Sequence, residues 1–287
     1  MKKLTYIVSA IAVILSAAAC TAIEGTEPGN DSLPGVAIYQ YAPGAGYNAD
    51  NDVKILVAAN SKADNVYYIA EKKADYDSHI AQGEQSYAQY IISSGTKLTV
   101  NPTGMGGTKE AEVYIKGLEG EYVITAVASA GSDTDLSSTS FTGLLYEDYK
   151  TGKYIFGNAT IAKIMGGDTI EGVKLMKCTN KANIYLFKDL FGAGHSMKIE
   201  TLPDYTGYDD GNYTFFRIPA QPTGLTYGNY GEIGVRDIGY WQGNSAWITD
   251  NGYESGIFDD GYCFIYAQWY VSAGSLGYKY DYFVPEN

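Results

Sequence analysis

The chain has 287 residues, 45% of them hydrophobic and 18% charged, and it carries a formal net charge of −13 at pH 7. This acidic balance argues against nucleic acid and anionic lipid headgroups as partners, because their phosphates would repel the chain. The 28 tyrosines and 34 glycines favour strands joined by tight turns, so we expect an all-β protein with two domains of ordinary size.

Residues 1–19 have the pattern of a secretory signal peptide. Lys2 and Lys3 precede an apolar run from Leu4 to Leu15, and small residues follow that run. The run is too short for a permanent membrane span, whereas a basic start, an apolar middle and small residues before a cleavage site are typical of an export signal. We therefore expect the chain to be exported.

Cys20 directly follows a row of three alanines. This arrangement resembles the lipobox of bacterial lipoproteins, in which the cysteine receives a lipid before the signal peptide is removed. The resemblance implies that Cys20 anchors the protein to a membrane. Residues 20–35 are rich in Gly, Pro and acidic side chains and lack apolar periodicity, so we expect a flexible tether there.

The acidic tether also resembles that of exported lipoproteins of the Bacteroidota. Surface lipoproteins of that group often carry acidic residues soon after the lipidated cysteine, which implies an outer-membrane location at the cell surface. The tripeptide Asp31-Ser32-Leu33 resembles the O-glycosylation acceptor of the same proteins. The resemblance implies that Ser32 is the candidate glycosylated residue.

The first domain is expected over residues 36–142. Val53–Ala59 and Asn65–Ala70 are rich in residues that favour strands, and the polar segment 60–64 separates them as a turn. Aromatic and aliphatic residues then recur at helical spacing over residues 76–92. We expect one short helix or two helical turns in that segment.

A family resemblance lies in the segment 117–128. Leu118 stands at a turn, and Tyr122 opens a long apolar strand. This pattern resembles the closing strands of fibronectin type III domains, in which the hydroxyl of that Tyr ties back to the preceding connection. The resemblance implies a β-sandwich of the fibronectin III or immunoglobulin type. Such domains are common spacers in surface lipoproteins of glycan-utilisation systems, where they hold the next domain away from the membrane.

The second domain is expected over residues 143–287. Short strand-forming runs alternate there with turns rich in Gly, Asp and Asn, which is typical of a β-sandwich of the jelly-roll type. In the most regular run, alternate residues from Cys263 to Val271, including Trp269, are expected to point inward. The candidate strands are Lys153–Phe156, Ala159–Ile164, Val173–Cys178, Ile184–Phe187, Met197–Thr201, Tyr213–Ile218, Gly231–Val235, Ala246–Thr249, Tyr262–Val271 and Tyr278–Val284.

Two cysteines remain besides Cys20. In an exported chain, Cys178 and Cys263 can pair as a disulfide. The alternative is a pair of buried free thiols that pack as small apolar side chains. The sequence leaves both alternatives open.

Catalytic motifs are weak in this sequence. His79 and His195 lie far apart, and no closely spaced ligand set for zinc is present. Ala273–Gly277 loosely resembles a nucleophile elbow, but strands flank it on both sides where that motif needs a helix. Most acidic residues of the second domain stand beside Gly or Asn in turns, although two carboxylates across a cleft would suffice for glycoside hydrolysis. We expect no catalytic residue, no metal and no cofactor, with a glycoside hydrolase as the least favoured alternative.

Aromatic side chains in polar connections are the candidate binding residues. Tyr205 lies in a segment rich in Asp and Gly, and Tyr240, Trp241 and Trp247 lie in a segment rich in Gly, Gln and Asn. A ring in such a loop can stack on a sugar while neighbouring polar groups bind its hydroxyls. The alternative is that Trp241 and Trp247 cover one end of the core.

These observations lead to a functional hypothesis. We expect a non-enzymatic, lipid-anchored surface protein whose first domain is a spacer and whose second domain binds a glycan. The alternative is a structural or adhesive surface protein that binds a protein partner through strand edges and tyrosine-rich faces.

Overall fold

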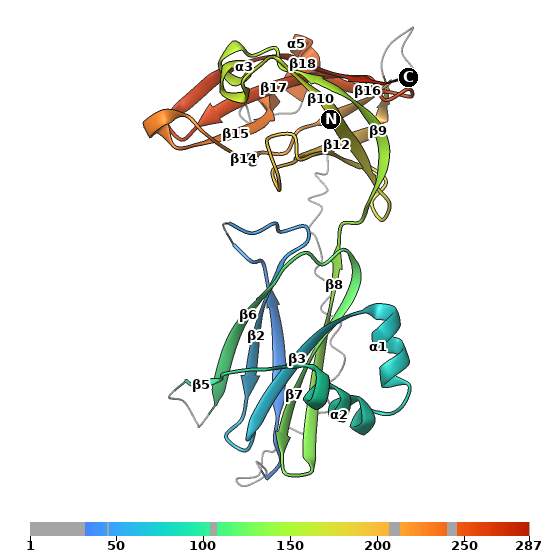
Figure 1. Cartoon of the computed structure of the whole chain (residues 1–287), viewed down its shortest axis with the longest axis vertical. Helices are drawn as coiled ribbons and strands as arrows, with labels where there is room; N and C mark the ends of the chain where they lie inside the picture. Colours follow the sequence, from blue (N-terminus) through green and yellow to red (C-terminus); the bar gives the residue numbers. More distant parts are fainter. Residues whose placement is uncertain (1–31, 45, 104–107, 207–212, 240–245, 287) are drawn as a thin grey trace, which may run out of the picture. The chain divides into compact units, whose positions relative to one another are not determined.

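A computed structural model describes residues 32–44, 46–103, 108–206, 213–239 and 246–286 (Figure 1). The side chains at positions 203–206, 246, 247 and 249 lie outside the described part. Strands make up most of the secondary structure, which confirms the all-β prediction. Among the described residues, no helix has the length and apolar character needed to cross a bilayer.

The chain divides into two compact units. The first unit comprises residues 1–44, 53–115 and 122–141, and the second comprises residues 45–52, 116–121 and 142–287. The short segments 45–52 and 116–121 therefore group with the second unit, although they precede residue 143 in the sequence.

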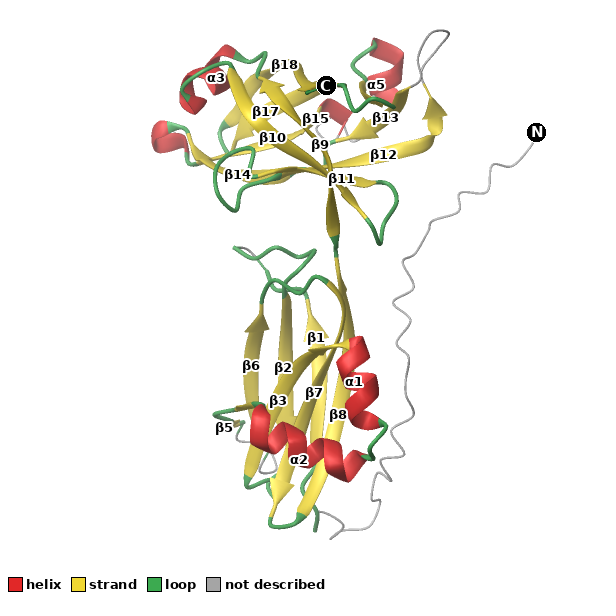
Figure 2. Cartoon of the chain, turned by 45° about the vertical axis from the view of Figure 1, so that its right-hand side comes forward, coloured by secondary structure: helices red, strands yellow, loops and turns green. Residues whose placement is uncertain are grey.

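Two sheets build the first unit (Figure 2). One has the order β1-β2-β6-β5 and the other has the order β4-β3-β7-β8. On β2, the buried side chains of Val53, Ile55 and Val57 alternate with more exposed ones, so one face of that strand belongs to the core. The strands are β1 (Val36–Tyr41), β2 (Val53–Ala59), β3 (Asn65–Lys72), β4 (Thr96–Lys97), β5 (Asn101–Pro102), β6 (Lys109–Ile115), β7 (Gly120–Ala130) and β8 (Asp133–Gly143).

Two helices cover one face of the second of these sheets. They are α1 (Lys73–Ile80) and α2 (Glu84–Ser94), and Tyr87 and Ile91 of α2 pack in one cluster with Val127 of β7 (Figure 2). Gly83 separates the helices with a φ of 99°, a conformation that favours glycine. The prediction of helical structure over residues 76–92 is confirmed, and the structure shows it as two helices.

One sheet that closes on itself builds the second unit. Its order is β14-β15-β17-β16-β13-β12-β11-β10-β9-β18, and β18 also pairs with β17. Phe283 of β18 lies opposite Cys263 of β17 and opposite Tyr154 of β9, which closes the ring. The expected jelly-roll-like pair of sheets is therefore corrected to a single closed sheet, whose strands surround the core instead of facing it from two sides.

The strands of the second unit are antiparallel throughout. They are β9 (Tyr146–Ile155), β10 (Thr169–Cys178), β11 (Ile184–Lys188), β12 (Met197–Thr206), β13 (Tyr213–Arg217), β14 (Gln221–Thr226), β15 (Glu232–Asp237), β16 (Ser255–Phe258), β17 (Cys263–Val271) and β18 (Gly274–Pro285). The 3₁₀ helix η1 (Gly228–Tyr230) joins β14 to β15. Of these strands, β14 and β16 are missing from the sequence prediction.

Two segments predicted as strands are helices in the structure. They are α3 (Ala159–Met165) and α5 (Ala246–Asn251). The side chain of Asn158 accepts hydrogen bonds from the first amides of α3, and Gly166 ends that helix in a left-handed conformation. Asn before a helix and Gly after it are standard capping residues, so the local sequence contained the signal for α3.

Large side chains fill the ring of the second unit. Tyr154, Phe187, Trp269 and Phe283 are fully buried there in one cluster, together with Cys263. The predicted inward face of the strand that carries Cys263 and Trp269 is therefore confirmed. The ring encloses a packed core, so any ligand of this unit must bind outside the core.

Cys178 and Cys263 are free thiols, and both are buried. Cys263 lies in the ring core, whereas Cys178 packs in a separate cluster with Leu144 and Ile184. Because the two cysteines belong to different clusters, they do not form the disulfide that one alternative predicts. The structure instead contains two buried free thiols, which was the other alternative.

The turn at Leu118 is held by Asn51. The Asn51 side-chain amide donates to the carbonyl oxygens of Leu118 at 2.9 Å and Leu144 at 2.8 Å. A Cβ atom at Gly143 would lie 1.6 Å from the Leu118 oxygen, so only glycine fits there. The Tyr122 ring instead lies under the Lys72 ammonium, 4.3 Å away. Among the described residues, the hydroxyl contact that the fibronectin resemblance assigns to Tyr122 is not found.

Candidate functional site

Each aromatic residue predicted to bind a ligand either lies outside the described residues or has a side chain that is not described. Tyr240 and Trp241 are outside the described residues, and so is Cys20. Tyr205 lies on β12 and Trp247 in α5, but their side chains are not described. Ser32, the candidate glycosylation site, lies exposed in a turn before β1.

The segment that holds Tyr240 and Trp241 begins and ends at one cluster. Ile238 precedes this segment and Ile248 follows it, and both are buried against Tyr266 of β17. A Cβ atom at Gly239 would lie 2.6 Å from Ile248 Cδ1, so glycine allows the two flanks to approach each other. The described flanks therefore connect the predicted binding loop to the outer surface of β17.

That outer surface carries a row of aromatic side chains, which we call the aromatic face. It consists of Phe264 and Tyr266 on β17 and Tyr278, Tyr280 and Tyr282 on β18. In the strand register, Phe264 lies opposite Tyr282 and Tyr266 lies opposite Tyr280. Because alternate residues of a strand point to opposite sides, the same alternation that places Cys263 and Trp269 in the core places these rings outside.

The aromatic face is covered in its middle, at Tyr266, and exposed on either side, at Tyr278 and Tyr282. Tyr253 stacks on Tyr266, with ring centroids 4.7 Å apart and planes 11° apart, and Tyr266 is 7% exposed. Tyr278 and Tyr282 are 46% and 36% exposed. The rings of Tyr280 and Tyr282 lie 6.4 Å apart and are inclined by 25°, so they form a nearly parallel row along β18.

The phenols in the covered middle of this surface stay neutral. Burial raises the pKa of Tyr266 and of Tyr280 above the ordinary value for tyrosine. The Tyr280 hydroxyl donates to the Gly252 carbonyl oxygen at 3.0 Å, which fixes that ring. A row of phenols offers apolar ring faces together with hydroxyl groups, a combination suited to sugars and to protein surfaces.

A second group of exposed rings lies in the β14–β15 hairpin. Tyr227 and Tyr230 are 36% and 57% exposed, and their centroids lie 5.8 Å apart with planes 23° apart. Gly228 and Gly231 adopt φ angles of 49° and 85°, and the Tyr227 amide donates to the Gly231 carbonyl at 2.9 Å. Sequence reasoning missed this pair, although its signal is of the same kind, aromatic residues beside Gly and Asn in a turn.

Three acidic residues of the second unit make structural contacts. Glu254 pairs with Arg217 at 2.7 Å, and both side chains are 12% exposed. Asp237 accepts a hydrogen bond from a backbone amide, and Asp260 accepts one from an amide in its own turn. The Asp260 contact is that of a turn residue. The Glu254 and Asp237 contacts join segments that are distant in the sequence.

Asp281 is a buried carboxylate inside the ring. Its Oδ2 accepts from the Tyr154 hydroxyl at 3.0 Å, and its Oδ1 accepts from the Gly157 amide at 2.7 Å. Burial raises the pKa of Asp281 to about 7, although these hydrogen bonds act in the opposite direction. Because Asp281 is fully enclosed by the core, we interpret it as a structural group that fixes the turn before α3.

Metal-binding groups do not gather in the part of the chain that the structure describes. No set of three or more His, Cys, Asp or Glu side chains is placed to share an ion there. His79 lies 2.7 Å from Glu71 through Nδ1, and the His195 amide donates to the Gly192 carbonyl in a turn. The two histidines therefore belong to separate local structures.

Comparisons with known proteins give no family. No family model matches the chain, and no curated protein matches it. Among solved structures, it is similar to a Kfla1895 D451A mutant, at 12% identity and a TM-score of 0.22, over 82% of this chain and 28% of that one. It is also similar to a cycloalternan-degrading enzyme from Trueperella pyogenes, at 9% identity and a TM-score of 0.21, over 82% of this chain and 31% of that one. The chain spans less than a third of these proteins, and likenesses this distant carry no argument about function.

Proposed function

We propose that this chain is a non-enzymatic, lipid-anchored protein of the outer cell surface whose second unit binds carbohydrate. The observation that carries the proposal is the aromatic face on β17 and β18. The flanks of the loop that holds Tyr240 and Trp241 are buried beside that face. We place the ligand against the exposed rings of this face, Tyr278 and Tyr282, and against the predicted binding residues Tyr205, Tyr240, Trp241 and Trp247.

The chemistry of the aromatic face suits a neutral sugar. Exposed rings such as those of Tyr278 and Tyr282 stack on the apolar side of a pyranose, and phenol hydroxyls exchange hydrogen bonds with its hydroxyl groups. The net charge of −13 disfavours anionic polysaccharides. The ligand class is therefore a neutral glycan.

The first unit has the role of a spacer in this proposal. Its sheet orders, β1-β2-β6-β5 and β4-β3-β7-β8, match the division of an immunoglobulin-type sandwich into strands A-B-E-D and C-F-G with one added edge strand. This match supports the fibronectin III-like resemblance of the sequence. The helices α1 and α2, between β3 and β4, are an addition to that plan.

The membrane anchor is lipid at Cys20. Residues 1–19 act as the signal peptide, and residues 20–35 separate the lipid from the first strand, with Ser32 as the glycosylation candidate. Mass spectrometry of the membrane fraction tests this part: the mature chain begins at a diacylated Cys20. Recovery of an unmodified Cys20 in the cytosol contradicts it.

Glycan-array binding of the mature chain tests carbohydrate recognition. Two double variants, Tyr278→Ala with Tyr282→Ala and Trp241→Ala with Trp247→Ala, are each expected to weaken binding about tenfold, because each removes two stacking rings. The control is Tyr39→Ala with Tyr41→Ala, since those rings are 51% and 49% exposed on β1 of the first unit. The control is expected to bind like the unmodified chain.

Two outcomes of this experiment contradict the proposal. One is the absence of binding to every neutral glycan on the array. The other is binding that both double variants leave unchanged, which removes the aromatic face and the loop from the site.

A protein partner is the second candidate ligand. The exposed pair Tyr227 and Tyr230 favours it, because exposed tyrosines are enriched at protein interfaces. If the chain binds an outer-membrane transporter or a host surface protein, Tyr227→Ala with Tyr230→Ala should abolish co-purification of that partner. The aromatic-face variant should then leave co-purification unchanged.

A further inference from the structure

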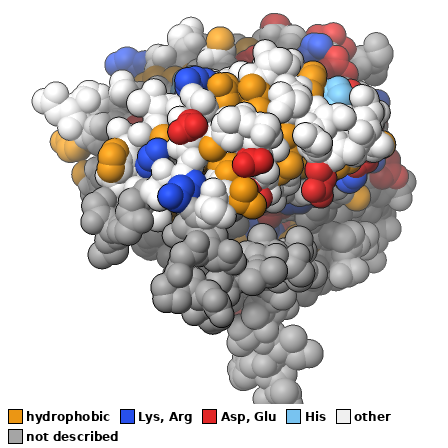
Figure 3. Space-filling model, turned by 90° about the horizontal axis from the view of Figure 1, so that it is seen from below, with side chains coloured by type: hydrophobic (Ala, Val, Ile, Leu, Met, Phe, Trp, Pro, Cys, Tyr) orange, Lys and Arg blue, Asp and Glu red, His pale blue; other side chains and the backbone are white. Residues whose placement is uncertain are grey.

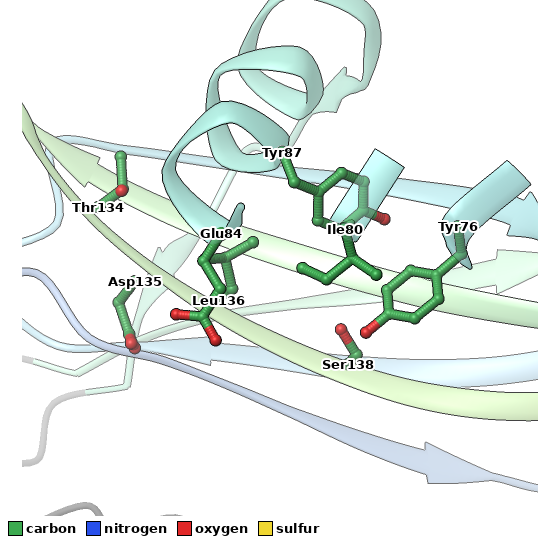
Figure 4. Close-up of a pocket in the computed structure, with 8 residues that line it drawn as sticks. All are labelled: Tyr76, Ile80, Glu84, Tyr87, Thr134, Asp135, Leu136 and Ser138. Carbon is green, nitrogen blue, oxygen red and sulfur yellow. The ribbon is translucent and has the colours of Figure 1, made fainter. Parts of the chain in front are cut away.

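A pocket in the first unit shows how a ring can border a cavity without being available to a ligand. Helices α1 and α2 and strand β8 enclose about 200 Å³, and Tyr87 is one of the residues that line this pocket (Figure 4). Tyr87 is only 1% exposed, so its ring is used in packing. A stacking site needs rings with an exposed face, and in the second unit Tyr278 and Tyr282 have one.

The outward side chains in the middle of the β17–β18 pair carry no charge. On the molecular face drawn in Figure 3, by contrast, hydrophobic side chains and charges of both signs are interspersed. A ligand that lies along these outward residues meets no charged group from either strand, which favours a neutral molecule. The residues are Phe264, Tyr266 and Gln268 on β17 and Tyr278, Tyr280 and Tyr282 on β18.

Tyr278 and Tyr282 lie four positions apart on one strand. The pairing of β17 with β18 is regular between them, from Gln268 opposite Tyr278 to Phe264 opposite Tyr282. A strand rises about 3.3 Å per residue, so the two side chains leave the same side of the sheet about 13 Å apart. The distance of 6.4 Å between the ring centroids of Tyr280 and Tyr282, which are two positions apart, agrees with that rise. The exposed rings are therefore two separate stacking positions in one line.

The middle of this line is covered by the chain itself. Tyr253 stacks on Tyr266 with ring centroids 4.7 Å apart, and Tyr266 is 7% exposed. The Tyr280 hydroxyl donates to the Gly252 carbonyl oxygen at 3.0 Å, which holds that ring in place. A ligand can therefore stack at the two ends of the line and pass over its middle. Because the strand pairing fixes the distance between the ends before binding, the entropic cost of binding is lowered.

Neighbouring side chains set the limits of the line. Near Tyr278, the next outward ring on β17 is that of Tyr270, and the Arg236 guanidinium already lies 4.2 Å from its centroid. At the other end, the rings of Tyr262 and Tyr282 lie 6.4 Å apart with planes 30° apart, which widens the stacking position there. Tyr278 and Tyr282 therefore define the length of the surface that a ligand can use.

This length determines the size of the ligand. A single pyranose covers one ring, whereas about three linked sugars are needed to span about 13 Å. When one chain fills both positions, the second contact forms within a complex that already exists. The affinity therefore rises steeply with chain length until both positions are filled.

We infer that the aromatic face binds the interior of an extended, neutral glycan chain. Tyr278 and Tyr282 stack on two sugars of the same chain, and the sugar between them passes over Tyr280. An extended chain is favoured because both positions lie along one strand, so a chain that coils would leave the line after its first contact. This inference rests on the proposed carbohydrate binding and adds the length and shape of the ligand.

A length series of oligosaccharides tests the inference on the mature chain. The probes are linear β-1,4-linked oligomers of glucose, xylose and mannose with one to six units, because this linkage gives extended chains. In at least one series, calorimetric titration is expected to show affinity that rises about tenfold from dimer to tetramer and little further to the hexamer. The α-1,4-linked glucose hexamer, which coils, is expected to bind more weakly than the tetramer of that series.

Single variants assign the two stacking positions. Tyr278→Ala and Tyr282→Ala are each expected to weaken tetramer binding about tenfold and dimer binding by at most about twofold, because each variant leaves one position. Tyr278→Phe and Tyr282→Phe keep the rings and should bind the tetramer almost as tightly as the unmodified chain. The control is Tyr227→Ala with Tyr230→Ala, since those exposed rings lie 5.8 Å apart in the β14–β15 hairpin and form a separate pair. The control should leave the length dependence unchanged.

Four results overturn the inference and leave the proposed function standing, because a glycan still binds in each case. They are equal affinity for dimer and tetramer in every series that binds, tetramer binding that either alanine variant leaves unchanged, tighter binding of the coiled hexamer than of every extended one, and binding only to array glycans outside the three series. The absence of binding to every neutral glycan contradicts the proposed function itself. Circular dichroism of each variant shows that a loss of binding is not a loss of fold.

Discussion

Tyrosine has different surroundings in the two units. In the first unit, Tyr87 is 1% exposed and its hydroxyl is bound by Glu71 and Thr125 beneath two helices. In the second unit, Tyr278 and Tyr282 lie on the outside of a closed sheet whose interior is already filled. The comparison shows that a ring contributes to stability where its hydroxyl finds a buried partner, and becomes available for binding where the core is complete without it.

The two units also hold a buried carboxylate in different ways. Glu71 in the first unit lies 2.7 Å from His79 Nδ1 and accepts a hydrogen bond from the Tyr87 hydroxyl at 2.7 Å. Asp281 in the second unit accepts only from the Tyr154 hydroxyl and backbone amides, so burial raises its pKa to about 7. The stability of the second unit should therefore depend on the proton that Asp281 holds.

The largest expected effect is the difference in lost stability between removing the buried ring of Tyr87 and removing the exposed ring of Tyr282. Tyr87→Ala removes a fully buried ring and leaves Glu71 without its hydroxyl partner, so we expect the first unit to lose about 4 kcal/mol of stability. Tyr282→Ala removes a half-exposed ring and should cost about 0.5 kcal/mol in the second unit. Urea denaturation with hydrogen exchange read out for each unit measures both values. Equal losses would contradict the comparison.

Asp281 gives the next largest effect, as a pH dependence. A carboxyl group whose pKa is higher in the folded state stabilises the fold fully below its unfolded pKa, near 4, and this contribution is lost as pH rises through the folded pKa of about 7. Between pH 4 and pH 7 we expect the second unit to lose about 3 kcal/mol from this group.

The variant Asp281→Asn isolates that contribution. The asparagine side chain has nearly the same shape and no charge, so the stability of the variant relative to the unmodified chain should rise from pH 4 to pH 7 and then level off. Thermal unfolding of both proteins across this range makes the measurement. A stability difference that stays constant with pH would show that Asp281 is not the titrating group.

The smallest expected effect concerns helix ends. In the second unit, the Asn158 side chain caps α3 and its amide also donates to the Leu276 carbonyl, whereas α1 and α2 in the first unit have no side-chain cap. Asn158→Ala should cost about 1 kcal/mol, and Asn158→Asp, which keeps the capping oxygen, should cost less. Calorimetry of the two variants compares them. Equal costs would mean that the cap adds nothing to α3.

Local patterns predicted the features that depend on neighbouring residues. The helical spacing over residues 76–92 predicted the helical region, because residues on one helix face recur at a short, fixed interval. The alternation from Cys263 to Val271 predicted which side chains enter the core, including Trp269. The error at α3 came from weighing the apolar run Ala159–Ile164 above its capping residues, Asn158 and Gly166.

The candidate site was only partly predictable, because local patterns do not show which distant strands and helices come together. The sequence pointed to aromatic residues in the second unit, but the aromatic face forms only when β17 and β18 align Phe264 with Tyr282 and Tyr266 with Tyr280. The pocket of the first unit needs Glu84 from α2 and Asp135 from β8, which are distant in the sequence. Neither the aromatic face nor the pocket corresponds to a motif within one short segment of the sequence.

The β-rich class, the acidic charge, the helical segment and the inward face of β17 follow from composition or from short-range periodicity. The other features depend on contacts between segments that are distant in the chain. The closure of β18 onto both β17 and β9, the separation of Cys178 from Cys263 and the convergence of α1, α2 and β8 around one pocket all depend on pairings between distant segments. Such pairings minimise exposed apolar surface and unpaired backbone groups over the whole unit, so no single segment encodes them.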